Sequence, residues 1–218
     1  MPQKNIKTIF FDYDGTLHNG LKIYAPAFRT AYAYLVENSF ADARYWTDEE
    51  ISYWLGFNPV DMWNTFMPDL DDKTKATCTD IISAVMKSLT ELGKAELYEG
   101  SEEVLAYLKN KGYRLVFISN CKNYYRDVHR KMFRLERYFE DFIASEEYGF
   151  LPKNEILASV KGKYEEGMAI IGDRIQDIYA GKENNFLTVG CNYGYGSAEE
   201  LQDADFVIED VIELKDLF

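Results

Sequence analysis

The stretch that decides the fold is Ile6-Lys7-Thr8-Ile9-Phe10-Phe11, followed at once by Asp12-Tyr13-Asp14-Gly15-Thr16. The first part is rich in β-branched and aromatic residues, which is typical of a buried strand, and the second part is typical of a polar turn. Side chains two apart in extended backbone point the same way, so we expect Asp12 and Asp14 to face one site. Adjacent carboxylates repel each other unless a metal ion or a proton intervenes. Taken alone, the pair is equally compatible with two turn-forming aspartates.

Strands alternate with helices in the second half of the chain. The predicted strands are 113–118, 142–144, 168–171, 187–189 and 206–208, and the predicted helices are 101–111, 122–135, 153–161, 175–184, 198–201 and 214–218. This alternation predicts an α/β fold, with a Rossmann-like parallel sheet covered by helices on both faces. Ligands bind at the carboxyl edge of such sheets.

Polar residues stand at three further positions along this edge. Ser119 and Asn120 follow one predicted strand, Lys153 opens a helix, and Asp173 and Asp177 follow another strand. Each has an ordinary alternative: Ser119 or Asp173 could cap a helix, and most lysines are solvated surface charges. Together, a hydroxyl, an ammonium and several carboxylates at one sheet edge predict a phosphate site that depends on Mg²⁺, which prefers carboxylate oxygens.

The segment after the first strand has a different character. Apolar residues recur at helical spacing in 26–38 and 71–92, and Thr47 with Glu50 forms the pattern of a capping box at the start of another helix. No strand is predicted between the first strand and the alternating region.

We therefore expect two domains: an α/β core made of residues 1–17 and 98–218, and a small all-α cap domain made of residues 18–97. The predicted cap carries the three tryptophans of the chain, Trp46, Trp54 and Trp63. Their helical context favours helix–helix packing over an aromatic pocket for an organic leaving group. Arg29 and Arg44 are the candidates in this segment for contact with a second anionic group of a substrate.

Composition narrows the class of protein. The chain has 218 residues, with 24 Lys and Arg against 37 Asp and Glu, for a net charge of −13. This charge disfavours nucleic acid and anionic membranes as partners, whereas a bound metal still allows a small anionic substrate. No apolar run reaches the roughly 20 residues that span a bilayer. The absence of a signal segment and the three scattered cysteines favour a reduced, cytoplasmic protein, and we expect a monomer or homodimer.

The strand-end motifs resemble the four ordered motifs of the haloacid dehalogenase (HAD) superfamily of phosphohydrolases. The motifs are Asp12-Tyr13-Asp14-Gly15-Thr16, Ser119, Lys153 and Gly172-Asp173 with Asp177. The tail from Gly190 to Leu201 is similar to the phosphoglycolate phosphatase-like branch. The resemblance covers residues 1–17 and about 98–218, and the insert is similar only in its position and helical character.

The resemblance implies a phosphatase that acts on a small phosphorylated metabolite. In such an enzyme Asp12 is the nucleophile, which forms an aspartyl-phosphate, and Asp14 is the general acid and base. Ser119, Asn120 and Lys153 are implied to bind the phosphoryl oxygens.

The resemblance also implies a magnesium site. Mg²⁺ is implied to bind Asp12, the backbone carbonyl of Asp14, and Asp173. Asp177 is implied to orient a metal-bound water or to support the phosphate-binding lysine, and Thr16 lies behind the ligands.

Three alternatives remain open at this stage. A phosphotransferase similar to β-phosphoglucomutase keeps the same four motifs. A phosphate-binding protein could retain this fold without turnover, although intact Asp12 and Asp14 argue against it. A response-regulator receiver uses similar residues but is shorter and has no cap. The presence of Asp14 also argues against dehalogenases and phosphonatases, because it favours cleavage of a C–O–P bond.

Five other residues near these motifs receive no catalytic role. His18 and His129 lack the spacing of metal ligands. Cys121 is expected to be a buried, inert thiol, and a thiol-sensitive activity is the alternative. Tyr193 and Tyr195 lie in a glycine-rich turn and are expected to pack between sheet and loop.

Overall fold

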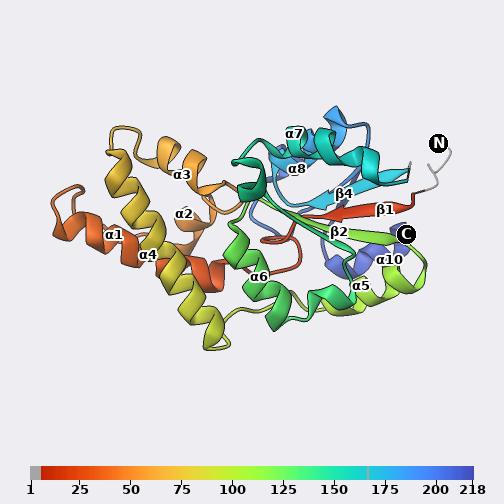
Figure 1. Cartoon of the computed structure of the whole chain (residues 1–218), viewed down its shortest axis with the longest axis horizontal. Coiled ribbons are helices and arrows are strands. Elements are labelled where there is room, and N and C mark those ends of the chain that lie inside the picture. Colours follow the sequence, from red (N-terminus) through yellow and green to blue (C-terminus); the bar gives the residue numbers. More distant parts are fainter. Residues whose placement is uncertain (1–5, 166) are drawn as a thin grey trace. The chain divides into compact units, whose positions relative to one another are not determined.

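The computed structural model describes residues 6–165 and 167–218, and the chain divides into two compact units (Figure 1). One unit comprises the segment that ends at Asn19 together with Leu97–Phe218, and the other is Gly20–Glu96. The sequence predicts residues 18–97 for this insert.

A six-stranded parallel sheet forms the centre of the first unit, which confirms the predicted α/β fold. The strands are β1 (Thr8–Phe11), β2 (Arg114–Ser119), β3 (Asp141–Ala144), β4 (Met168–Gly172), β5 (Leu187–Cys191) and β6 (Phe206–Ile208), in the order β3-β2-β1-β4-β5-β6. β1 is therefore central, with Phe11 aligned with Phe117 on one side and with Ile171 on the other. All four residues of β1 are buried, as its β-branched and aromatic composition predicts.

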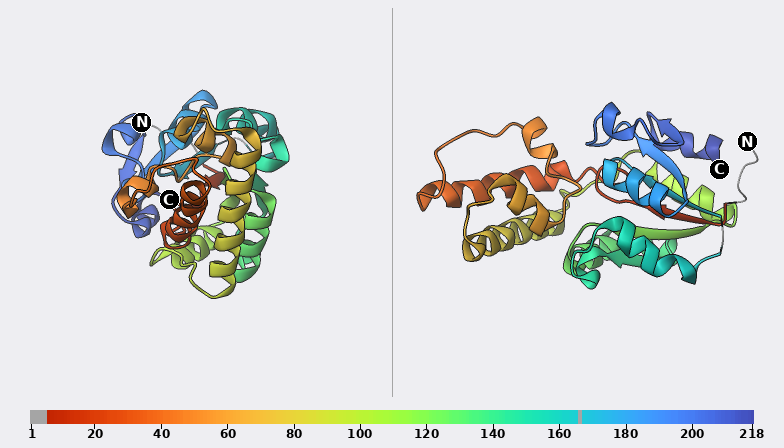
Figure 2. Two further views of the ribbon diagram at one scale, coloured as in Figure 1. Left: turned by 90° about the vertical axis from the view of Figure 1, so that its left-hand side faces the viewer. Right: turned by 90° about the horizontal axis from the view of Figure 1, so that it is seen from above.

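Helices cover both faces of the sheet, as Figures 1 and 2 show. One face carries α5 (Ser101–Asn110), α6 (Asn123–Met132) and α10 (Leu214–Leu217), and the other carries α7 (Lys153–Val160) and α8 (Ile175–Glu183). α9 (Ala198–Leu201) lies between β5 and β6 in the chain. Phe10 projects into the α7–α8 side, where it packs with Ile156, Leu157 and Phe186. This apolar layer supports the strand from which the first acidic motif emerges.

Most differences from the predicted elements are at their ends. The helix predicted over 122–135 stops at Met132, because Arg134 takes a left-handed conformation with φ 50°. The next residues form a 3₁₀ turn, η1 (Leu135–Arg137). Three further 3₁₀ turns were not predicted: η2 (Ser145–Tyr148), η3 (Lys161–Lys163) and η4 (Val211–Glu213). Such short turns lack the periodicity that sequence patterns detect.

The second unit is helical, and no strand is assigned within its residues, 20–96. Its helices are α1 (Leu21–Glu37), α2 (Asp48–Ser52), α3 (Pro59–Phe66) and α4 (Asp72–Glu91). The capping box predicted at Thr47 and Glu50 is confirmed. α1 begins before the predicted start at Pro26, because a proline within a helix removes only its own N–H donor and does not always end the helix. Among the described helices of the chain, none is long and apolar enough to span a membrane.

α3 was not predicted, although the sequence carries its start signal. The side-chain oxygen of Asn58 accepts hydrogen bonds from the backbone N–H groups of Val60 and Asp61, at 3.0 and 2.9 Å. Pro59 occupies the first helical turn, where its missing N–H is harmless. The helix is only eight residues long, so its apolar period is too short to stand out.

The three tryptophans of the second unit all pack against one phenylalanine, Phe66. The rings of Trp46, Trp54 and Trp63 lie 5.3, 5.1 and 5.8 Å from the ring of Phe66. Phe28 also packs against Phe66, at 5.4 Å. Trp63 is buried, and Trp46 and Trp54 are half-buried, so all three take part in packing within the helical unit, as the packing interpretation expects.

The two candidate cations of this unit have partners within it. Arg29 donates to the backbone carbonyl of Trp46 and pairs with Asp48. Arg44 pairs with Glu50 and stacks on Trp46, with its guanidinium carbon 3.7 Å from the ring centroid. These contacts give both arginines a structural role in the helical unit.

Candidate active site

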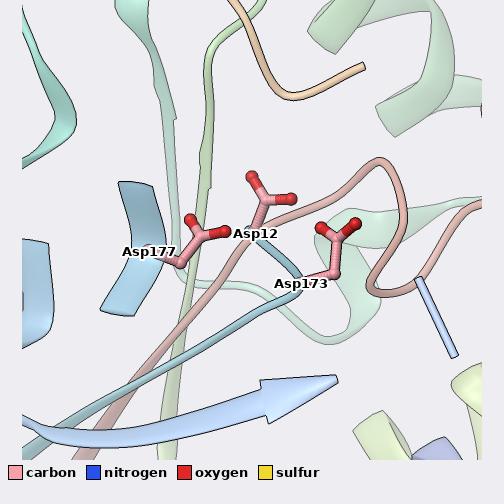
Figure 3. A group of neighbouring side chains, drawn as sticks. All are labelled: Asp12, Asp173 and Asp177. Atoms are coloured by element: carbon pink, nitrogen blue, oxygen red, sulfur yellow. The ribbon is translucent and has the colours of Figure 1, made fainter. Parts of the chain in front are cut away.

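Three buried carboxyl groups meet at the carboxyl edge of the sheet (Figure 3). Asp12 directly follows β1, Asp173 follows β4, and Asp177 lies in the first turn of α8. Each offers a carboxylate oxygen within 4.8 Å of the others. The topology explains the meeting, because β1 and β4 are neighbours that run in the same direction.

Lys153 joins two of these acids. It is the first residue of α7, and its side chain is only 3% exposed. Its Nζ donates to Oδ1 of Asp12 at 2.7 Å and also to Oδ1 of Asp177. The other oxygen of Asp177 accepts the backbone N–H of Arg174 at 3.1 Å, so this acid both caps α8 and holds the lysine.

The three carboxyl groups and Lys153 together form a site with more acidic than basic side chains. Burial raises the pKa of Asp12 above its ordinary value, and Lys153 opposes that rise. Burial likewise raises the pKa of Asp173 well above its ordinary value, and the charges of Asp12 and Asp177 add to the effect. Burial alone would lower the pKa of Lys153, but the two neighbouring carboxylates outweigh it and raise that pKa. The Lys153 ammonium thus contacts two of the three acids, and the charge of Arg174 opposes the rise in the pKa of Asp173 only in part.

Glycines make room for the acids. A Cβ atom on Gly15, which has φ 88°, would lie 2.1 Å from Oδ2 of Asp173. A Cβ on Gly194 would lie 2.3 Å from Cβ of Asp173, and one on Gly172 would lie 2.2 Å from Cγ of Asp177. Backbone therefore packs directly against the carboxyl groups at these positions.

The loop after β5 also supports Asp173. The backbone N–H of Tyr195 donates to Oδ2 of Asp173 at 2.7 Å, and the hydroxyl of Thr16 lies 3.5 Å from Oδ1. The hydroxyl of Tyr193 donates to the backbone carbonyl of Thr16 at 2.8 Å. Sequence reasoning gave this loop only a packing role. Its glycines were the signal that backbone approaches the site here.

Asp14 lies in a different environment, which sequence reasoning missed. Its Oδ1 accepts a hydrogen bond from the hydroxyl of Tyr125 at 2.7 Å and lies 2.7 Å from Nδ1 of His18. His18 is fully buried, and Tyr125 is 5% exposed. Burial raises the pKa of Tyr125 well above its ordinary value, and the charge of Asp14 adds to this, so the hydroxyl keeps its proton.

Ser119 and Asn120 lie at the end of β2, beside β1. Ser119 is 4% exposed. No hydrogen bond within the described residues joins its side chain to Asp12 or Lys153. The alternative that Ser119 caps α6 is wrong, because that helix has Lys122 at its N-cap position. Burial raises the pKa of the neighbouring thiol, Cys121, to about 12, as expected for an inert cysteine.

The alternative that Asp173 caps α8 is also wrong. The N-cap residue is Arg174, and Asp173 instead turns toward Tyr195 and Thr16. Its carboxyl group is thus directed into the acidic group and away from the helix terminus.

The donor set fits a hard divalent cation. Carboxylate oxygens are the ligands that Mg²⁺ prefers, and Mg²⁺ retains several of its waters when it binds. The negative charge that Lys153 leaves unbalanced would be offset by such an ion. All three acids offer an oxygen that could hold such an ion, although each also accepts a hydrogen bond from the protein.

Comparison with known proteins agrees with this geometry. The sequence pattern of the haloacid dehalogenase-like hydrolase family matches residues 9–191. A phosphoglycolate phosphatase of Nitrosococcus oceani is 32% identical over 133 residues, which cover 57% of this chain and 58% of that relative. Pyrophosphatase PpaX of Anoxybacillus flavithermus is 24% identical over 96% of this chain and 95% of its own length.

A solved structure shares the fold along the whole chain. A predicted phosphatase from Clostridium acetobutylicum superposes with a TM-score of 0.82 over 97% of each chain, at 23% sequence identity. The family match spans the strands that carry Asp12, Ser119 and Asp173. The chain therefore belongs to the haloacid dehalogenase-like hydrolase family and is an enzyme of the phosphatase type.

Proposed function

We propose that this protein is a Mg²⁺-dependent phosphatase that hydrolyses a small phosphorylated metabolite through an aspartyl-phosphate on Asp12. The observation that carries the proposal is the position of Asp12: it is buried at the end of the central strand, 2.7 Å from the Lys153 ammonium and beside two further acids. A carboxylate held against an ammonium and next to a cation site can approach a phosphoryl group that both positive charges attract.

The residues of the site divide the reaction between them. The Asp12 carboxylate attacks phosphorus, and the bond from phosphorus to the leaving oxygen breaks while Asp14 protonates that oxygen. Asp14 then takes a proton from the water that hydrolyses the aspartyl-phosphate, which releases phosphate and restores Asp12. Lys153, with Ser119 and Asn120 at the neighbouring strand end, orients the phosphoryl oxygens.

The acidic group would hold the metal. Asp12, Asp173 and the backbone carbonyl of Asp14 are the proposed ligands, with Asp177 and Thr16 holding these groups in place. Bound Mg²⁺ supplies positive charge that offsets the carboxylates and the phosphoryl oxygens.

The substrate is proposed to be a phosphoester or a phosphoanhydride of low molecular mass. The relatives named above act on phosphoglycolate and on pyrophosphate, according to their names. Both are small and strongly anionic, which matches a site with a cation position and one fixed ammonium.

The test is release of inorganic phosphate from p-nitrophenyl phosphate in the presence of Mg²⁺. Asp12→Asn should lower kcat/KM by roughly 10⁴-fold or more, the order seen when a nucleophile is removed. EDTA should abolish turnover, and added Mg²⁺ should restore it. Asp203→Asn, which alters an exposed acid of the same unit, is the control and should retain activity. Turnover that survives Asp12→Asn, or that is unaffected by EDTA, would refute the proposal.

A further inference from the structure

One oxygen of Asp14 is contacted by two side chains, His18 and Tyr125, that lie 107 residues apart in the chain. His18 Nδ1 and the Tyr125 hydroxyl both lie 2.7 Å from Oδ1. The two donors themselves are 3.4 Å apart, so they converge on this atom. No hydrogen bond from the described residues reaches the second oxygen, Oδ2. The carboxyl group is thus held in one orientation, with its two oxygens in different environments.

The His18 ring is itself fixed by aromatic neighbours. It stacks on Tyr13, with ring centroids 5.0 Å apart and planes 4° from parallel, and the His129 ring meets it edge-on at 4.7 Å. The hydroxyl of Tyr13 is hydrogen-bonded to His129 Nδ1 at 2.8 Å, which ties these two neighbours together. His18 Nε2 is buried without a hydrogen-bond partner among the described residues.

The orientation of the His18 ring leaves Nε2 without a partner in the described part of the chain but places Nδ1 against Asp14. A buried polar atom without a partner destabilises the fold. Turning the ring could offer Nε2 a partner only by removing Nδ1 from Asp14, and the stacking contacts oppose such a turn. The hydrogen-bonding capacity of His18 is therefore directed at one atom, Oδ1 of Asp14.

We infer that His18 and Tyr125 are positioning residues that fix which oxygen of Asp14 handles the proton. By occupying Oδ1, they leave Oδ2 as the atom that gives a proton to the leaving oxygen and later takes one from water. Each transfer moves one proton and leaves Oδ1 as a hydrogen-bond acceptor throughout. The inference rests on the proposed function, because it needs Asp14 to be the acid and base.

The role has a consequence that a purely structural contact would lack. A leaving group such as p-nitrophenolate departs readily without a proton, whereas phenolate, whose conjugate acid has a pKa near 10 as in tyrosine, gains much more from protonation. Loss of the correct Asp14 orientation should therefore slow hydrolysis of phenyl phosphate far more than that of p-nitrophenyl phosphate. The two substrates are close in shape, so binding differs little between them.

The experiment measures kcat/KM on both substrates for Tyr125→Phe, His18→Leu and His18→Asn, with Asp14→Asn as the reference for loss of the acid. Tyr164→Phe is the matched control, because its hydroxyl donates to Asp141 at 2.7 Å, an equally short tyrosine–carboxylate bond elsewhere in the same unit. Circular dichroism and thermal unfolding establish that each variant is folded before its kinetics are compared.

Tyr125→Phe and His18→Leu should lower kcat/KM for phenyl phosphate by roughly 10- to 100-fold, a part of the 10²–10⁴ that general acid–base catalysis contributes. For p-nitrophenyl phosphate the loss should stay below about threefold. His18→Asn should recover most of the lost rate, because the asparagine amide can donate near the position of Nδ1. Tyr164→Phe should behave as the unaltered protein on both substrates.

Two results would overturn the inference alone: equal losses on both substrates in the His18 and Tyr125 variants, or unchanged rates in these variants while Asp14→Asn loses phenyl phosphate selectively. Absence of Asp12-dependent turnover in the unaltered protein would overturn the proposed function, and this inference with it. The outcomes are therefore distinguishable within one set of measurements.

Discussion

Replacing His129 with asparagine tests how a buried neutral histidine links stability to pH. Burial, and then the neighbouring His18, lower the pKa of His129 from 6.5 to about 2. Between these two values the unfolded chain binds a proton at this residue and the folded chain does not. Stability is therefore lost as the pH falls below 6.5, and the loss continues down to the folded-state pKa. Any folded-state pKa well below 5 gives the same result at pH 5.

The size of the effect follows from the distance between the pH and the unfolded-state value of 6.5. Each unit of pH below that value lowers the free energy of unfolding by about 1.4 kcal/mol, so the His129 contribution at pH 5 is about 2 kcal/mol. Asparagine does not titrate, and it retains a polar group for the Tyr13 hydroxyl, which lies 2.8 Å from His129 Nδ1.

The assay is urea unfolding of the unaltered protein and of His129→Asn at pH 8 and pH 5. The unaltered protein should lose about 2 kcal/mol more than the variant between the two pH values. Other titrating groups are common to both proteins, so they cancel in this difference. If both proteins lost the same free energy, His129 would have to bind a proton as easily when folded as when unfolded, and the argument from burial would be wrong.

Three further predictions concern stability. Gly194→Ala should destabilise the protein by about 1–3 kcal/mol, because the new methyl group overlaps Asp173, while Gly162→Ala, where the space is open, should not. Asn58→Ala should cost about 1 kcal/mol through loss of the α3 cap. Both effects are measured by chemical unfolding. Saturating Mg²⁺ should raise the melting temperature of the unaltered protein but much less that of Asp173→Asn, and equal shifts would contradict the proposed ligand set.

The meeting of the acidic residues could be predicted because it follows from topology. In a parallel sheet every strand delivers its carboxyl end to the same edge, so Asp12 and Asp173, which directly follow β1 and β4, needed only correct strand assignments to be placed together. The apolar composition of β1 and β4, and the polar residues that follow each of them, made those assignments possible. For Asp177 the resemblance implies one of two roles, to orient a metal-bound water or to support Lys153, and the structure places it in contact with Lys153.

The surroundings of Asp14 could not be predicted in this way. Tyr125 is 111 residues from Asp14 in the chain and reaches it from α6, whose rotation about its own axis is set by packing. His18 is near in sequence, but the turn that brings it back to Asp14 has no regular period. The spacing of His18 and His129 in the sequence excludes a typical metal site and carries no information about a positioning role. The number of residues between Asp14 and its two partners therefore does not predict that they are in contact.

The central place of β1 has a mechanical consequence. The backbone N–H of Asp12 still donates to Ile171 at 2.8 Å, so the interstrand ladder extends to the residue itself. The margins of the sheet are short strands, and at β6 two residues, Phe206 and Val207, are about half exposed. Fraying should begin at these margins and reach β1 last, so the amides around Asp12 should exchange with solvent most slowly. The Asp12 carboxylate, the proposed nucleophile, is therefore attached to the part of the sheet whose hydrogen bonds should open least often.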